Sequence, residues 1–322
     1  MRARTGRDTA AGAAPPTTAG APVTGYGFQW RYSGDPDWND VARSPSQTSY
    51  SLTAADGSKA VEARVRAANR AGNSAWSSTA TLAAASLRRF TGARHSASDF
   101  AIAIDGRATP YGIWSDGTTA WVSDSQNDRL WANTLATGAR DTNKEIGLPP
   151  IDGYHVSNTG IWSDGTTIWV ADNRVDRVRA YTLATGARDT TKEFSIAVSG
   201  GIRPSALWSD GTTLWVTDGS ANATAARAFT LATGARDSSK DLTQPTGPSG
   251  SCAGIWSDGS TYWATLTGGD SEGVYAFSMS TGARDSSQDI DLGAGNTTPR
   301  GIWSDGETMW VVDSNKTVYA YR

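Results

Sequence analysis

The chain contains one cysteine and two histidines in 322 residues, and both scarcities limit its chemistry. With Cys252 alone no intrachain disulfide can form, and the paired C-x-x-C spacing of structural zinc sites is absent. His95 and His155 are the only imidazoles, and no nucleophile elbow, zinc-site spacing or phosphate loop is present. We therefore expect that the protein is not an enzyme and that it needs no cofactor.

Long apolar runs and an excess of basic residues are missing as well. No stretch approaches the about 20 apolar residues of a membrane helix, and the basic N-terminal residues lack the apolar stretch of a signal peptide. The formal net charge of −3 and the pI near 5.5 offer no broad cationic surface for phosphates. We expect no nucleic-acid partner, no membrane insertion and no export signal in the chain as written.

Glycine and tryptophan are abundant instead. The chain has 35 Gly, 14 Trp and 12 Pro, and only 19% of its residues are charged. This balance favours many short strands joined by loops over helices. Only 5 of the 29 basic residues are lysines, and the usage rich in arginine, alanine and glycine is typical of a GC-rich bacterial genome.

A repeat in the C-terminal two-thirds of the chain predicts the fold. The segment GIWSDGTTAWVSD begins at Gly112, and similar segments begin at Gly160, Ala206, Gly254 and Gly301. The first Trp of each copy lies at position 114, 162, 208, 256 or 303, so the copies are 48, 46, 48 and 47 residues apart. A second motif, TGAR, recurs at nearly the same spacing, from Thr91, Thr137, Thr185, Thr233 and Thr281. Such periods indicate a repeat architecture.

One copy of the repeat contains four predicted strands, which is the content of a propeller blade. In the second copy these strands are Ile161 to Ser163, Thr166 to Ala171, Val178 to Leu183 and Glu193 to Val198. Asp164-Gly165 is read as a two-residue hairpin turn, which places Trp162 opposite Thr167 and makes Trp169 its diagonal neighbour. We expect the paired tryptophans to lie in the core between blades, and the arginine of each TGAR motif to form ion pairs in its turn or between blades.

The two ends of the repeat region complement each other. The first TGAR copy precedes only a fourth strand, Phe100 to Ile104, and the chain stops at Arg322 after a third strand. Joining them would complete one blade and close a ring of five without unpaired edges. The alternative is a longer natural array that is cut at both ends.

The motifs GIWSDGTTIWVAD, RVRAYTL and ATGARD resemble the NHL-type and SMP-30-like propeller repeats, and also tandem repeats in large bacterial surface proteins. The resemblance covers Thr91 to Arg322 and implies a β-propeller over residues 87–322. It does not select a function, because propellers host both binding and catalysis.

Residues 22–86 show a different pattern, which resembles the second half of a fibronectin type III domain. The matching features are Tyr26 with Trp30, Tyr50 with Leu52, the strand at Arg64 to Ala67, and Trp76. Residues 1–21 are rich in Ala, Pro and Thr and are predicted to be disordered, so two strands of such a sandwich have no counterpart. We therefore expect the chain to be part of a longer polypeptide. The resemblance implies an extracellular or cell-surface location.

One face of the predicted propeller carries the loops that differ between copies, namely those between second and third strands and those that enter each first strand. Loops free to vary are where function is usually placed. On this face the second strand ends in a series of carboxylates that could hold calcium, or that could simply cap the following loop: Asp124, Asp172, Asp218 and Asp313. Candidate ligand-binding residues at or beside the mouth of the channel are Tyr111, Asn127, Asp128, Tyr154, His155, Asn173, Arg174, Arg203 and Arg300.

The leading hypothesis is a noncatalytic extracellular binding or adhesion module that recognises a glycan, a peptide or a protein on this face. Tyr and Arg can anchor such ligands by stacking and forked hydrogen bonds. One alternative is a divalent-metal-dependent lactonase or lyase similar to the SMP-30-like enzymes. The second alternative is a structural spacer of a larger surface protein.

Overall fold

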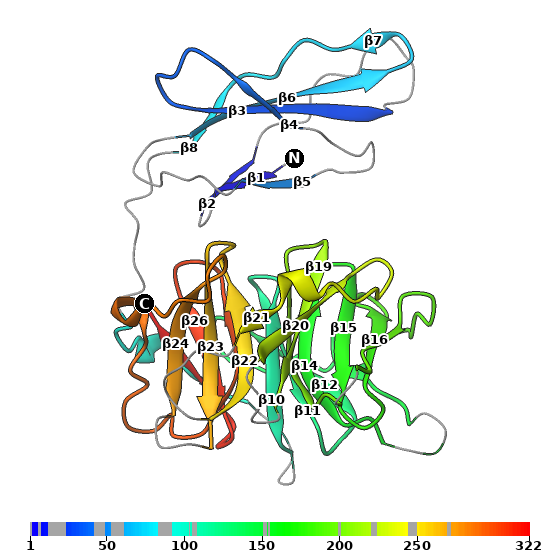
Figure 1. Ribbon diagram of the computed structural model, residues 1–322, viewed down its shortest axis with the longest axis vertical. Helices are drawn as coiled ribbons and strands as arrows, with labels where there is room; N and C mark the ends of the chain where they lie inside the picture. Colours follow the sequence, from blue (N-terminus) through cyan, green and yellow to red (C-terminus); the bar gives the residue numbers. More distant parts are fainter. Residues whose placement is uncertain are drawn as a thin grey trace. The chain divides into compact units, whose positions relative to one another are not determined.

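The computed structural model describes residues 2–5, 8–11, 24–41, 49–52, 61–82, 92–102, 104, 108–150, 153, 155–198, 201–219, 224–243, 250–268 and 272–322. They belong to two compact units, Met1–Arg89 and Phe90–Arg322 (Figure 1). Regular structure is nearly all β, as predicted, and the helices described are three short 3₁₀ turns at Ser96–Ser98, Ser238–Lys240 and Ser286–Gln288. Over these ranges no helix is long and apolar enough to cross a membrane.

The first unit is built on two long antiparallel strands, β3 (Gly25–Tyr32) and β6 (Val61–Asn69). Strand β4 (Asn39–Val41) pairs with β3, while β7 (Gly72–Asn73) and β8 (Ala80–Leu82) pair with β6. Buried and half-buried residues alternate along the whole of β6. This alternation is the period of a strand with one covered face.

A second sheet of this unit has the order β2-β1-β5, with β1 at Arg2–Thr5, β2 at Asp8–Ala11 and β5 at Ser49–Leu52. Both β1 and β2 lie in residues 1–21, the stretch that composition predicts to be disordered. Strand pairing uses backbone N–H and C=O groups that nearly every residue carries, whatever the side-chain composition. Residues 12–21 of that stretch lie outside the described ranges.

The second unit contains five antiparallel sheets among its described residues; four are ordered along the chain, and the fifth adds the early strand β9 beside β27. Their strands are β10 (Pro110–Ser115), β11 (Thr119–Asp124), β12 (Arg129–Thr134) and β13 (Ile146–Gly147); β14 (Asn158–Ser163), β15 (Thr167–Asp172), β16 (Arg177–Thr182) and β17 (Phe194–Ser195); β18 (Pro204–Ser209), β19 (Thr213–Asp218), β20 (Thr224–Thr230) and β21 (Leu242–Thr243); β22 (Ser251–Ser257), β23 (Thr261–Thr267) and β24 (Gly273–Ser278); and β25 (Pro299–Ser304), β26 (Met309–Asp313), β27 (Thr317–Tyr321) and β9 (Phe100–Ala101).

The first strands of these sheets contact one another around a closed circuit, β10 to β14, β18, β22, β25 and back to β10. The sheets are therefore arranged radially about one axis. This arrangement is a β-propeller. The fold class that the repeat predicted is confirmed.

The last sheet joins both ends of the repeat region. In β27, Thr317 pairs with Ala101 and Val318 pairs with Phe100 of β9. Beyond this pair, the backbone N–H of Ala93 donates to the carbonyl of Arg322 at 3.0 Å, and the N–H of Arg322 donates back to Ala93 at 2.9 Å. The strand that precedes the repeats and the strand that ends the chain therefore lie in one sheet.

The hairpin between first and second strands differs from the predicted two-residue turn. Trp162 lies directly opposite Trp169, and Ser163 lies opposite Ile168, so the loop has four residues, and the predicted pairing of Trp162 with Thr167 is wrong. Side chains cap the longer loop. The Asp164 carboxylate accepts hydrogen bonds from Thr166 and Thr167, while the Ser163 hydroxyl accepts the Gly165 N–H and donates to the Thr167 carbonyl.

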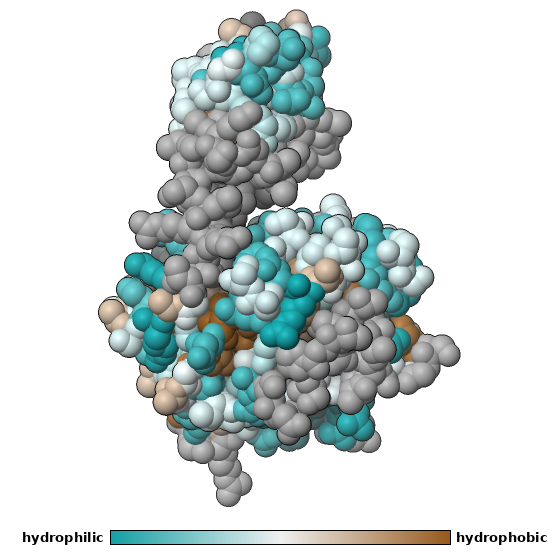
Figure 2. Space-filling model, turned by 60° about the vertical axis from the view of Figure 1, so that its left-hand side comes forward, coloured by the Kyte–Doolittle hydropathy of each residue, from teal (hydrophilic) through white to brown (hydrophobic). Residues whose placement is uncertain are grey.

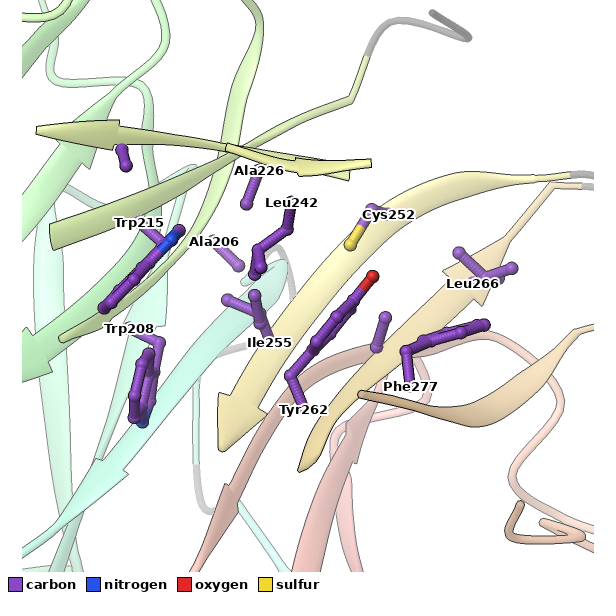
Figure 3. Close-up of a cluster of buried hydrophobic side chains, with 12 residues drawn as sticks. Ala206, Trp208, Trp215, Ala226, Leu242, Cys252, Ile255, Tyr262, Leu266 and Phe277 are labelled. Carbon is purple, nitrogen blue, oxygen red and sulfur yellow. The ribbon is translucent and has the colours of Figure 1, made fainter. Parts of the chain in front are cut away.

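The five tryptophan pairs face each other across their hairpins, with ring centroids 5.0–5.5 Å apart. They are buried or half-buried in the clusters between neighbouring sheets, so their predicted core role is confirmed. Figure 3 shows one such cluster, in which Trp208 and Trp215 lie on one side of Ile255, and Tyr262 and Cys252 lie on the other. Burial raises the pKa of the Cys252 thiol to about 12, so this single cysteine stays protonated.

Each TGAR turn is held by an ion pair inside the turn. Arg188 donates to both carboxylate oxygens of Glu193, at 2.6 and 2.7 Å, five residues further along the chain. The same pairing occurs between Arg94 and Asp99, Arg140 and Glu145, Arg236 and Asp241, and Arg284 and Asp289. Of the two predicted uses of these arginines, the turn pair is the one that forms.

Small residues at the axis let the first strands approach closely. Gly112, Gly160, Ala206, Gly254 and Gly301 line a cavity of about 10 Å³, measured as the space open to the centre of a water molecule. A Cβ atom added to Gly301 would lie 2.5 Å from the carbonyl oxygen of Tyr111 in the next sheet. A space of this size holds about one water. At the level of these residues the axis is therefore too narrow for an organic ligand.

We expect Gly112→Ala to destabilise the second unit by about 1–3 kcal/mol, the usual cost of overpacking a close contact. The new Cβ would lie 2.8 Å from the backbone N of Ile161 and from the carbonyl O of Thr159. Gly147→Ala is the matched control, because nothing lies within 4 Å of its added Cβ. Urea unfolding followed by tryptophan fluorescence measures both, and equal stabilities would contradict the close packing of the axis.

Candidate functional site

The antiparallel order of each sheet separates its loops into two sets. The hairpin loops of the WSDG motif and the TGAR turns end on one face. The loops from second to third strand, and the segments that enter each first strand, end on the other, which we call the variable-loop face. The sequence-predicted site residues that the structure describes belong to this face or to the strand ends beneath it.

The predicted carboxylate series caps the loops of the variable-loop face. One oxygen of Asp124 accepts the backbone N–H groups of Thr109 and Gln126, both at 3.0 Å. Its second oxygen accepts the side-chain N–H groups of Asn127 at 2.7 Å and of Trp131 at 2.8 Å. Both oxygens of this buried carboxylate therefore have donors from the protein itself.

The other members of the series are bound in similar ways. Asp172 accepts Arg179 Nε at 2.8 Å, and Asp218 accepts a terminal guanidinium nitrogen of Arg227 at 3.0 Å. Asp313 accepts backbone N–H groups from the preceding segment and from its own loop. Within the described part of the chain, no three His, Cys, Asp or Glu residues are grouped as metal ligands. Calcium binding by the series stays a prediction, and the observed role of these side chains is capping.

Removal of one buried carboxylate tests this role. We expect Asp172→Ala to lower the free energy of unfolding by about 3–5 kcal/mol, because the buried Arg179 would lose its ionic partner. The Arg179 side chain is 5% exposed. The double variant Asp172→Ala/Arg179→Met should recover much of the loss, and chelation by EDTA should not change the melting temperature of the native protein. Stabilisation of the native protein by millimolar calcium would instead establish a metal site.

Two equivalent aspartates of the variable loops have different surroundings. Asp128 and Asp176 both adopt left-handed backbone angles, with φ of 48° and 49°. Asp128 binds Nδ1 of His155, whose side chain is 77% exposed. The structure thus brings together two residues that the sequence proposed separately. Because the segment entering the next first strand has Gly201 where the previous one has His155, Asp176 has no such partner.

The pKa of Asp176 is raised, mainly by burial and then by the negative charges of Asp172 and Asp218. A carboxylate whose pKa is higher in the folded state binds protons more readily there than in the unfolded chain. The free energy of unfolding therefore falls as the pH rises from the ordinary pKa of an Asp to the raised pKa of Asp176. This carboxyl group thus makes the folded state less stable at neutral pH than in acid.

Asp176→Asn is expected to stabilise the fold at neutral pH, and the gain should disappear as the pH falls below the ordinary titration range of Asp. Asn also tolerates the left-handed backbone, so the change isolates the charge. Asp128→Asn is the matched control, because it removes a carboxylate that has a histidine partner. Thermal melts of both variants between acidic and neutral pH measure the effect, and a uniform shift at every pH would contradict the electrostatic cause.

At the mouth of the axis, five equivalent positions surround the centre of the variable-loop face: Tyr111, Thr159, Ser205, Ala253 and Arg300. The Arg300 guanidinium carbon lies 4.8 Å from the centre of the Tyr111 ring, and both residues are half-buried. Thr159 and Ala253 are buried. The mouth is therefore asymmetric, with one aromatic residue and one cation on one side and small side chains on the other.

The remaining predicted residues belong to the surrounding loops. Asn127 donates to Asp124, and Arg203 is exposed while its backbone N–H donates to Asp218. Asn173 and Arg174 form the loop after Asp172, where their N–H groups donate to Ser157 and Asp172. Tyr154 lies outside the described residues.

Sequence reasoning missed the buried partners Arg179 and Arg227, although both occupy the same position of the third strand. It also missed Asn158, a fully buried side chain whose amide N and O have no hydrogen-bond partner. The sequence did distinguish Asn158, because three other copies of the repeat have a proline at the same position: Pro110, Pro204 and Pro299.

No family model and no curated protein matches this sequence. Among solved structures, glutaminyl cyclase of Myxococcus xanthus matches 71% of this chain and 96% of its own, with a TM-score of 0.53 and 14% identity. A virginiamycin B lyase of Staphylococcus aureus, solved as a catalytically inactive variant with quinupristin, matches 90% of this chain and 86% of its own, with a TM-score of 0.40 and 15% identity. Hydrazine synthase of Kuenenia stuttgartiensis matches 65% of this chain at 17% identity, with a TM-score of 0.40, and the present chain spans 57% of that chain.

At this identity the likeness to glutaminyl cyclase shows the fold alone, and it agrees with the propeller seen here. It also corrects one expectation. The inference from missing catalytic motifs that the chain is not an enzyme is wrong, because an enzyme is built on a related propeller fold. Catalytic groups of a propeller can come from loops of different blades, so short sequence motifs do not reveal them.

Proposed function

We propose that the second unit is a five-bladed propeller that acts as a recognition module and binds its ligand on the variable-loop face. The support comes from the ring of sheets and from the filled axis. With a central cavity of about 10 Å³, a ligand larger than water has to bind outside the axis. The variable-loop face is the one where the repeats differ in side chains.

The observation that carries this proposal is the pair of Arg300 and Tyr111 at the mouth of the axis. A guanidinium stacked on an aromatic ring combines apolar contact area with directed donors, which is the chemistry of anchors in binding sites. Large apolar side chains are not the basis of recognition, because Val175, at 45%, is the single exposed one among the described residues. The view of Figure 2 is mostly hydrophilic, with small apolar areas.

We further propose that the first unit is a fibronectin type III-like domain and that the protein acts outside the cell or at its surface. The strand pair β3 and β6, with its regular alternation of burial, is compatible with half of such a sandwich. The partner in this proposal is an extracellular glycan, peptide or protein.

The proposal is tested with Tyr111→Ala and Arg300→Ala in pull-downs from cell-surface material and on a glycan array. We expect the native protein to capture a ligand and each variant to lose at least about tenfold in affinity, since a central anchor contributes about 2 kcal/mol or more. The matched control is Arg284→Ala on the opposite face, where the guanidinium also lies 4.8 Å from an aromatic ring, that of Tyr275.

Equal losses in the control and in the mouth variants would indicate general destabilisation and contradict the assigned face. Failure of the native protein to bind anything on the array or in the pull-down would remove the recognition proposal itself.

A further inference from the structure

Arg300 is a cation without an anion. No carboxylate of the described residues forms an ion pair with it, although the TGAR arginines and the buried Arg179 and Arg227 all have one. Its Nε is buried and has no hydrogen-bond partner. Its guanidinium lies over the Tyr111 ring. A half-buried charge of this kind normally has an ionic or hydrogen-bonding partner, because desolvation without one is costly.

The acceptors around the mouth are already in use. The carbonyl of Thr159 accepts the Ser123 hydroxyl, and the carbonyl of Pro204 accepts the Thr159 hydroxyl at 2.9 Å. The next two carbonyls around the ring accept hydroxyls in the same way, from Ser205 to Cys252 and from Thr265 to Arg300. These bonds join neighbouring sheets, and each of the four carbonyls already has a hydroxyl donor from the protein.

The nearest carboxylates in the strand register are occupied as well. Asp124 lies opposite Pro110, and Asp313 lies opposite Pro299, each one residue before a mouth position. Asp124 has four donors, and Asp313 accepts backbone N–H groups of Thr298 and Asn315 at 2.7 and 2.8 Å. Arg300 is thus the cationic group of the mouth, and its buried Nε has no acceptor.

We propose that this mouth binds the carboxylate of an acidic sugar, with the group held by the Arg300 guanidinium and the sugar ring lying over the small side chains opposite. The inference rests on the proposed recognition function and names its ligand class. A guanidinium matches a carboxylate through two parallel hydrogen bonds. A peptide is disfavoured, because its backbone N–H groups need acceptors, and four of the carbonyls around the mouth already accept a hydroxyl. A uronate needs mainly donors for its charged group.

The experiment titrates the full chain with glucuronic acid, and in parallel with glucuronamide, which has the same shape but no charge, using calorimetry at low and high salt. We expect glucuronic acid to bind at least about tenfold more tightly than the amide, since a charge-assisted hydrogen bond is at stake. The difference should shrink as salt rises. Arg300→Gln should abolish it, and Arg284→Gln on the opposite face should leave it unchanged.

Folding of each variant is checked by its thermal melt. Arg300→Lys keeps the positive charge but loses the two parallel N–H donors of the guanidinium, so it should bind with intermediate affinity. Equal binding of acid and amide, or unchanged binding by a folded Arg300→Gln, overturns the inference. Tighter binding of an N-acetylated dipeptide than of glucuronic acid overturns it in favour of a peptide ligand. Capture of a neutral glycan that is lost in Tyr111→Ala but kept in Arg300→Gln would overturn this inference while leaving the recognition function intact.

Discussion

The close approach of the first strands at the axis is the contact on which the rest of the second unit depends. Gly112, Gly160, Gly254 and Gly301 leave room for the backbone of the neighbouring strand, and a Cβ at these positions would collide with it. Once these strands meet, the faces of adjacent sheets are brought together and the tryptophan pairs fill the space between them. The ligand-accessible surface is thereby moved from the channel to the loops around its mouth.

Much of this fold could be predicted from the repeat, because residue types at fixed positions in each copy favour particular strands and turns. The spacing of Trp162 and Trp169 indicates a hairpin, and the TGAR arginine indicates a charged turn. The length of the hairpin loop was missed. The dipeptide Asp164-Gly165 favours a two-residue turn on its own, but hydrogen bonds from the Ser163 and Asp164 side chains stabilise a four-residue loop. Turn propensity and side-chain capping favour different loop lengths here, and the sequence pattern alone does not show which of them prevails.

The candidate site was predictable residue by residue but not as an arrangement. Asp128 and His155 were both proposed, but their contact joins loops of two different repeats and depends on how the blades pack. The same is true of Tyr111 and Arg300, which are neighbours because the first and last repeats meet. The expectation about catalysis failed for a related reason. It searched for motifs along the chain, whereas a propeller assembles its sites across blades.

The shared last sheet has a consequence for how the protein is made. Asp99 accepts a hydrogen bond from the backbone N–H of Ala320, which lies 221 residues later in the chain. During synthesis, β9 therefore has no partner until β27 has left the ribosome. Until then the ring is open, and apolar faces of the sheets formed earlier stay uncovered. Contacts between such distant segments form slowly. Closure of the ring therefore depends on β27, so a growing polypeptide cannot adopt this fold until Thr317–Tyr321 have been made.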